Sequence, residues 1–271
     1  MTQHFIQSTL QGFTRALSKA LLSEQVANQP GLLQQFDPRV RLVGMLSLVI
    51  SVVLCRRLEI VAVLFVIAVV IALASKVSLL SLTKRVWLIV LAFTGLIALP
   101  ALFTTPGDAI VFLPIRHLSI TTQGLRTALL LILRVETAAT LTTVLVFSTP
   151  WTHTLKALRS LHLPAEVVTM LAMTHRYVFL LLETANQMFE SRQSRTVGAL
   201  TGAESRRVAA RTAGVLLSKS MELSQEVYLA MISRGFRGDI QLLTEFRMKA
   251  RDYAGLAAFL CVGCLASWIG R

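Results

Sequence analysis

Five apolar stretches constrain this chain more than any other feature of its sequence. A helix needs roughly 20 predominantly apolar residues to cross a bilayer, and the stretches approach or reach that length: Leu42–Leu54, Leu58–Ala74, Val86–Phe103, Leu125–Phe147 and Tyr253–Ile269. The first two are short and are joined by Arg56 and Arg57, which predicts a helical hairpin whose charged ends extend to the membrane surface. The pattern predicts an all-α membrane protein with about five transmembrane helices.

The distribution of charge predicts the orientation of these spans. The chain carries 27 Lys and Arg against 14 Asp and Glu, but the basic residues lie beside and between the apolar stretches, which argues against nucleic-acid binding and for contact with anionic lipid. Residues 148–252 hold 14 Lys and Arg against 9 Asp and Glu. Such an excess predicts a cytoplasmic location. Four segments follow: a cytoplasmic N-terminal segment 1–41, a four-helix bundle 42–147 with an extracellular loop 104–124, a cytoplasmic region 148–252, and a C-terminal transmembrane helix 253–271.

Two long helices are expected within the cytoplasmic region. The first begins at Pro164, and its apolar residues fall on one stripe, which favours an amphipathic helix at the membrane interface over a sixth span: Val167, Leu171, Thr174, Val178, Leu181, Ala185 and Met188. The second is expected from about Glu204 to Ser233, after a turn at Val197–Ala203. We expect the two helices to cross. In the extracellular loop, Ala109–Leu113 and Leu118–Thr122 predict a short hairpin.

Both long helices end in arginines. The second ends in M-I-S-R-G-F-R-G-D at Met231–Asp239, where Gly235 can adopt the left-handed cap conformation and leave the guanidinium of Arg234 projecting beyond the helix. The first ends similarly in E-S-R-Q-S-R-T-V-G at Glu190–Gly198. Two such ends in one region indicate docking to a two-fold or pseudo-two-fold partner.

Few residues point to catalysis or metal binding. Cys261 and Cys264 lie in an apolar stretch without a nearby His or carboxylate, so we interpret them as packing residues. The histidines lack zinc-binding spacing, and no Walker A sequence is present, so no metal site, cofactor or ATPase activity is expected. Arg134 and Glu136 are ionisable residues within a predicted span. Because they cannot face each other at this spacing, we expect an ion pair with another helix, with a substrate role as the alternative.

These motifs together resemble a known family. The matching segments are F-D-P-R-V-R-L at Phe36–Leu42, G-L-R at Gly124–Arg126, H-R-Y-V-F-L-L-L-E-T-A at His175–Ala185, S-R-T-V-G at Ser194–Gly198, S-R-G-F-R-G at Ser233–Gly238 and E-F-R-M-K-A-R-D at Glu245–Asp252. In their order and spacing they resemble the transmembrane T component of energy-coupling-factor (ECF) transporters, the ABC-type importers of vitamins and transition metals. The similarity is greatest to the cobalt-type subgroup, CbiQ.

The resemblance implies a non-catalytic scaffold in a bacterial inner membrane. In that family two Ala-Arg-Gly-like motifs end the coupling helices, and each arginine enters a groove on one of two ABC ATPase subunits. By similarity these roles fall on Arg195, flanked by Ser194 and Thr196, and on Arg234, flanked by Ser233 and Gly235. A substrate-binding membrane (S) subunit, and in some systems a small accessory membrane subunit, would complete the importer. Cobalt is the expected substrate, with nickel or a vitamin as alternatives.

Two other classes of function are considered on the residues alone. A self-contained secondary transporter would normally carry paired broken helices or several polar residues within its spans, and this chain offers mainly Arg134 and Glu136. A membrane-embedded enzyme would need a cluster of His, Asp or Glu near one membrane face. The secondary transporter is therefore the stronger rival.

Overall fold

The computed structural model describes residues 31, 33–75, 86–104, 109–112, 119–195, 201–236 and 248–271, together with Gly12. These residues fall into two compact units. One lies within residues 1–24 and 158–245 and contains the two long helices. The other lies within residues 25–157 and 246–271 and contains most of the remaining elements. We describe each unit separately.

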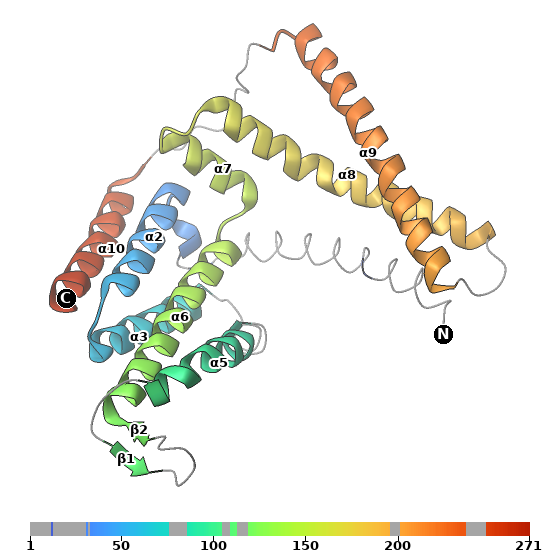
Figure 1. Cartoon of the computed structure of the whole chain (residues 1–271). Helices are drawn as coiled ribbons and strands as arrows, with labels where there is room; N and C mark the ends of the chain where they lie inside the picture. The colour runs from blue at the N-terminus through green and yellow to red at the C-terminus, as the bar shows by residue number, and fades with distance from the viewer. Residues whose placement is uncertain are drawn as a thin grey trace. The chain divides into compact units, whose positions relative to one another are not determined.

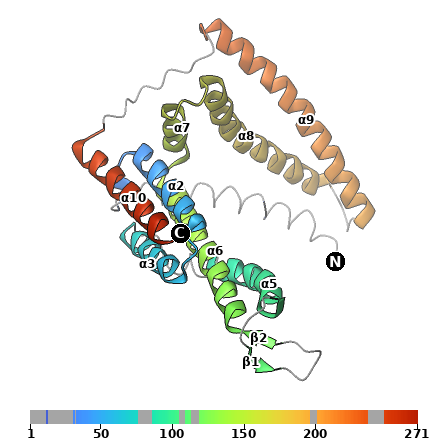
Figure 2. The same ribbon diagram turned by 60° about the vertical axis from the view of Figure 1, so that its left-hand side comes forward.

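The second unit is a helical bundle, and each of the five predicted apolar stretches forms a helix in it, whereas the helix at Trp151–Ser160 was not predicted. A short 3-10 turn, η1, at Leu33–Gln35 precedes α2 at Pro38–Leu54 and α3 at Leu58–Ala74. Further along the chain come α5 at Leu88–Thr104, α6 at Thr122–Ser148, α7 at Trp151–Ser160 and α10 at Ala250–Ile269. Figures 1 and 2 show α10 beside α2, and α5 beside the long helix α6.

The expected hairpin forms between α5 and α6. Strands β1 at Ala109–Phe112 and β2 at Ser119–Thr121 pair antiparallel, with Ala109 opposite Thr121 and Phe112 opposite Ser119. The register shifts between Ala109 and Val111, which is the signature of a bulge. Thr121 then caps α6, because its hydroxyl oxygen accepts from the amide of Gly124 at 3.1 Å.

Three helices in the described part of the chain are long and apolar enough to cross a bilayer by length and composition: α6, residues 165–192 of α8, and α10. The helix α3 and residues 88–100 of α5 are apolar but shorter. The prediction of an all-α membrane protein is confirmed. The interface position expected for the first long helix stays a prediction, because its length and composition also suit a span.

Close packing of α10 on α2 depends on glycine. A Cβ atom on Gly44 of α2 would lie 2.8 Å from the ring of Phe259, and one on Gly255 of α10 would lie 2.7 Å from the ring of Phe36. On Gly263 it would lie 2.9 Å from the hydroxyl of Ser51. Small residues of this kind let two membrane helices approach closely.

On the other side of the bundle, Trp87 links α3 to α6. Its indole nitrogen donates to the hydroxyl of Thr140 at 3.0 Å, and its ring lies 5.5 Å from that of Phe65. The buried apolar core runs along these helices and includes Met45, Leu48, Val61, Leu64, Ala68, Leu141 and Val144.

Two arginines join α2 and α6, because each helix carries an arginine that bonds a carbonyl at the C-terminal end of the other helix. Arg41, near the start of α2, donates from Nη1 to the carbonyl of Ser148, the last residue of α6, at 2.5 Å. Arg134, in the middle of α6, donates from Nη2 to the carbonyl of Cys55, the C-cap of α2, at 2.5 Å. The helices are therefore antiparallel, and a guanidinium satisfies carbonyls that have no partner within their own helix.

The first unit contains the two long helices, α8 at Ala165–Arg195 with 31 residues and α9 at Gly202–Ser233 with 32 residues. The helix α9 runs back in the opposite direction to α8, and Figure 1 shows that the two helices cross at an angle. The helix α9 begins two residues before the expected start, so the predicted turn at Val197–Ala203 is wrong at its end. Thr201 explains the earlier start: its hydroxyl accepts from the amide of Glu204 at 3.3 Å, and the Glu204 carboxylate accepts from the amide of Thr201 at 2.8 Å.

We predict that Gly44→Ala destabilises the bundle, because the new methyl group meets Cβ and ring atoms of Phe259 that cannot move without moving α10. Overpacking of this kind costs about 1–3 kcal/mol. Thermal unfolding in detergent should shift to lower temperature. The matched control is Gly95→Ala in α5, where nothing lies within 4 Å of the new atom. Its melting temperature should stay unchanged or rise, because alanine is the better helix former.

Candidate functional site

The end of α9 is a fully formed helix cap that presents Arg234. The amide of Gly235 donates to the carbonyl of Ile232 at 2.9 Å, and the amide of Phe236 donates to that of Met231 at 3.0 Å. These two bonds define a Schellman motif. It requires a left-handed residue, and Gly235 has φ of +82°. The predicted cap at Gly235 is therefore confirmed, and Arg234 is the exposed C-cap residue.

The end of α8 presents Arg195 in a different way. Arg195 is the last residue of the helix and is exposed. The hydroxyl of Ser194 donates to the carbonyl of Glu190 at 3.1 Å, within the helix itself. Thr196 and Gly198 lie outside the described residues, so the expected cap at this end is not described. Arg192 and Arg195 both fall in the last turn, where positive charge is favourable beside the helix dipole.

The start of α9 is held by the side chain of Glu204. Its carboxylate accepts from both the amide and the hydroxyl of Thr201, at 2.8 and 2.9 Å. These hydrogen bonds favour the ionised form and lower the pKa of Glu204 below its ordinary value. A negative charge in the first turn also suits the positive end of the helix dipole.

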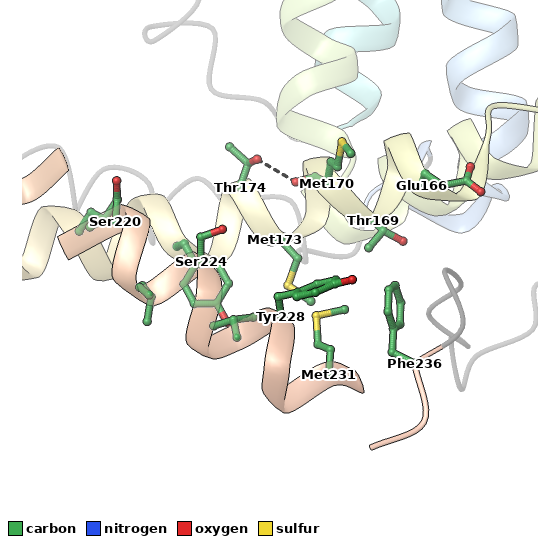
Figure 3. Close-up of a pocket in the computed structure, with 14 residues that line it drawn as sticks. Glu166, Thr169, Met170, Met173, Thr174, Ser220, Ser224, Tyr228, Met231 and Phe236 are labelled. Carbon is green, nitrogen blue, oxygen red and sulfur yellow. Dashed lines mark hydrogen bonds between the residues drawn. The ribbon is translucent and has the colours of Figure 1, made fainter. Parts of the chain in front are cut away.

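A largely apolar pocket of about 530 Å³ lies between α8 and α9. Three of its lining residues are methionines, Met170, Met173 and Met231, and Figure 3 shows Met173 and Met231 beside Tyr228. Residues of both helices line it: Glu166, Thr169, Met170, Met173, Thr174, Tyr177 and Leu181 from α8, and Ser220, Leu223, Ser224, Val227, Tyr228 and Met231 from α9, with Phe236 following. Phe236 and Met231 belong both to the pocket and to the cap of α9, so the cap that presents Arg234 also forms one wall of the pocket.

The pocket differs from the apolar stripe expected along α8. Thr174 and Leu181 of that stripe line the pocket, and Ala185 is buried, but Val167 and Val178 are 40% and 45% exposed. The face toward α9 is instead centred on Met170, Met173 and Tyr177. The sequence analysis assigned the stripe to the membrane interface and named no face of α8 for contact with α9, because helical spacing alone does not say which side of a helix meets a particular neighbour.

Arg134 and Glu136 of α6 form no ion pair among the described residues. Arg134 donates to the carbonyl of Cys55 instead. Glu136 is only 6% exposed, and neither of its carboxylate oxygens has a hydrogen-bond partner. The expected ion pair is therefore absent from the described contacts of this chain. The structure brings Arg134 to the C-terminal end of α2 and leaves Glu136 buried without a hydrogen-bond partner among the described residues.

No group of three His, Cys, Asp or Glu side chains within the described ranges is arranged to hold a metal ion. Cys261 and Cys264 are both exposed on α10. Cys55, which the sequence leaves isolated, is buried, and its thiol donates to the carbonyl of Ala266 at 3.1 Å. Cys55 thus has a packing and hydrogen-bonding role in the bundle.

Comparison with known proteins places these features in context. The family model for CbiQ, a cobalt transport protein, matches residues 31–245. An uncharacterised protein of Methanocaldococcus jannaschii is 31% identical over 98% of this chain and 92% of its own length. A cobalt transport protein CbiQ of Rhodobacter capsulatus is 25% identical over 63% of this chain and 70% of its own length. An energy-coupling factor transporter transmembrane protein EcfT of Listeria innocua is 26% identical over 86% of this chain and 91% of its own length.

We predict that Gly235→Ala loosens the end of α9. The left-handed conformation costs a residue with a Cβ atom about 1–2 kcal/mol, so the two hydrogen bonds of the cap should open more often. The amides of residues 235 and 236 should therefore exchange with solvent faster in a hydrogen-exchange measurement. Gly235→Asn is the matched control, because asparagine tolerates this conformation better than alanine. Equal protection in the wild type and Gly235→Ala would show that the cap does not hold the helix end.

Proposed function

Because the chain belongs to the CbiQ family of cobalt transport proteins, we propose that it is the T component of an ECF importer. In this role it is a non-catalytic membrane scaffold that couples ATP hydrolysis by two partner ATPase subunits to uptake through a separate S subunit. The coupling is carried by α8 and α9. Their exposed terminal arginines, Arg195 and Arg234, are the observation on which the proposal rests.

A helix-end arginine suits a contact that must persist while a partner moves. The guanidinium offers five donors in a rigid planar fork, keeps its charge at every physiological pH, and binds a carboxylate in two places at once. Two such residues, one on each helix end, fit two copies of an ATPase. When ATP brings the two copies together, each copy pulls one helix end, and the angle between α8 and α9 changes.

The apolar pocket between α8 and α9 supports the proposal of an S subunit as the second kind of partner. Its lining is mostly aliphatic, aromatic and methionine side chains, and methionine adapts readily to different partner surfaces. A transmembrane helix of the S subunit is the occupant we propose, because such a helix is apolar on all sides. A change in the angle between α8 and α9 would reshape this pocket and so release or tilt the S subunit.

Cobalt is the substrate we propose. The family is described by cobalt transport, and the Rhodobacter capsulatus relative is named for the same substrate. Nickel or a vitamin is the alternative, since the Listeria innocua relative is named only as an energy-coupling factor protein. In either case the S subunit, not this chain, would select the substrate.

The protein is a membrane protein, and we propose that it lies in the inner membrane of a bacterium. The N-terminus and residues 148–252 face the cytoplasm in this proposal, because residues 148–252 carry the basic excess. This orientation places both Arg195 and Arg234 on the side where ATP is available.

We predict that Arg234→Glu prevents stable binding of the ATPase subunits. Loss of a charge-assisted contact costs about 1.5–3 kcal/mol, and reversal of the charge costs more. Co-purification of the ATPases from membranes measures the effect, and Arg195→Glu should weaken binding in the same direction. Arg211→Glu is the matched control, because Arg211 is exposed on the same helix but lies away from its end. Wild-type recovery of ATPase with Arg234→Glu would contradict the docking role.

We also predict that the purified chain in liposomes neither hydrolyses ATP nor carries Co²⁺. The sequence has no phosphate-binding loop, so hydrolysis should require the added ATPase pair, and uptake should require the S subunit as well. Protein-dependent Co²⁺ uptake by this chain alone, with or without a proton gradient, would favour a secondary transporter that uses the buried carboxylate of Glu136.

A further inference from the structure

Arg41 is buried at the start of α2 and binds three oxygen atoms from other segments. Its side chain is 4% exposed. Nε donates to the carbonyl of Phe36 at 3.0 Å, and Nη1 donates to the carbonyl of Ser148 at 2.5 Å and lies 3.5 Å from the hydroxyl of Thr149. The guanidinium thus closes the C-terminal end of α6, where unpaired carbonyls and the helix dipole favour positive charge.

Asp252 attaches the start of α10 to the same place. This residue is 3% exposed. Its Oδ1 accepts from the amide of Asp37 at 3.1 Å, and its Oδ2 accepts from the amide of Lys249 at 2.8 Å. The charges of Asp37 and Asp252 both attract the guanidinium of Arg41. We call Asp37, Arg41, Ser148, Thr149 and Asp252 the junction cluster.

The path of the chain gives this cluster its importance. Residues 158–245, which contain α8 and α9, form a segment inserted between residues 157 and 246 of the bundle, and residues 1–24 belong to the same unit as this segment. The chain leaves the bundle through α7, which begins at Trp151, two residues after Thr149. It returns at α10, whose N-cap residue Lys249 is bonded to Asp252. Both connections of this inserted segment to the bundle therefore start at the junction cluster.

We propose that the junction cluster is the mechanical joint through which movement of α8 and α9 enters the bundle, with Arg41 and Asp252 as its positioning residues. This inference rests on the proposed function, which supplies the movement. The two connections alone would let the end of α6 and the start of α10 move independently. Because Arg41 and Asp252 bond both of them to residues 36 and 37, these helix ends move together with α2. Buried charged hydrogen bonds suit this purpose, since water does not compete for them.

The test uses the double variant Arg41→Gln/Asp252→Asn, which removes both opposite charges and leaves neither buried alone. Spin labels replace Val146 near the end of α6 and Tyr253 near the start of α10, which are 64% and 60% exposed, in a chain whose three native cysteines are changed to serine. In the wild type we expect one narrow distance distribution, for the isolated chain and for its ATPase complex with and without nucleotide. In the double variant we expect a broad distribution that shifts by about 2 Å or more with nucleotide.

Transport measurements on the same variants distinguish a joint from a purely structural role. The double variant should keep its ATPase partners and hydrolyse ATP, yet lose Co²⁺ uptake per ATP hydrolysed. Arg41→Lys, which keeps the charge without the fork, should recover part of the coupling. Arg134→Gln is the matched control: it removes a guanidinium at the other end of α2, so the distance between labels 146 and 253 should stay narrow.

Two outcomes would overturn the joint: a distribution in the isolated double variant as narrow as in the wild type, or full coupling of uptake to hydrolysis. Failure of the wild-type chain to retain any ATPase is a different result. It would contradict the proposed function, whereas the distances in the isolated chain would still decide whether Arg41 and Asp252 hold the two helix ends together.

Discussion

The bundle depends on the pair of arginines that close the ends of α2 and α6. In an apolar environment each unpaired helix carbonyl is costly, because no water is present to bond it. Arg41 satisfies the end of α6, and Arg134 satisfies the end of α2. Fourteen positions separate Arg41 from Cys55, and the same number separate Arg134 from Ser148, a rise of about 21 Å in each helix. The equal spacing sets the register of the antiparallel pair, because both bonds form only at one relative position of the helices.

The remaining contacts of α2 build on this register. With α6 on one side, α2 receives α10 on another, at glycine positions that admit the rings of Phe36 and Phe259. At the far end of α10 the amide of Arg56 donates to the carbonyl of Gly270 at 2.7 Å, and the thiol of Cys55 donates to that of Ala266. The turn after α2 is thus bonded to both α6 and α10. Helices from the beginning, middle and end of the chain form one bundle around α2.

The inserted unit follows a different principle of construction. Its two long helices expose many apolar side chains, among them Met170, Leu217, Met221, Tyr228 and Leu229, which is costly in water and ordinary for a surface covered by lipid or by a partner. Its ends are fixed by local backbone bonds, as the Schellman motif at Gly235 and the capping box at Thr201 show. Rigid ends on a unit with an uncovered apolar pocket suit a part that docks to partners and moves with them.

The sequence alone determined the features that depend on neighbouring residues. The apolar stretches gave the positions of α2, α3, α5, α6 and α10, two short segments on either side of Pro114 gave the hairpin of β1 and β2, and the glycine after Arg234 gave the cap of α9. Each follows from helical or strand period and from local cap chemistry, which act over a few residues.

Only the tertiary structure decided which distant groups meet. The sequence marked Arg134 and Glu136 as candidates for an ion pair with another helix, but Arg134 bonds a carbonyl 79 positions away and the Glu136 carboxylate has no hydrogen-bond partner among the described residues. It placed Arg41 in a motif without a role, and the bond to Ser148 spans 107 positions. It also did not show which face of α8 lines the pocket beside α9. The reason is physical: a backbone carbonyl at a helix end has no residue-specific signature in the sequence, so its long-range donor is fixed only when the helices pack.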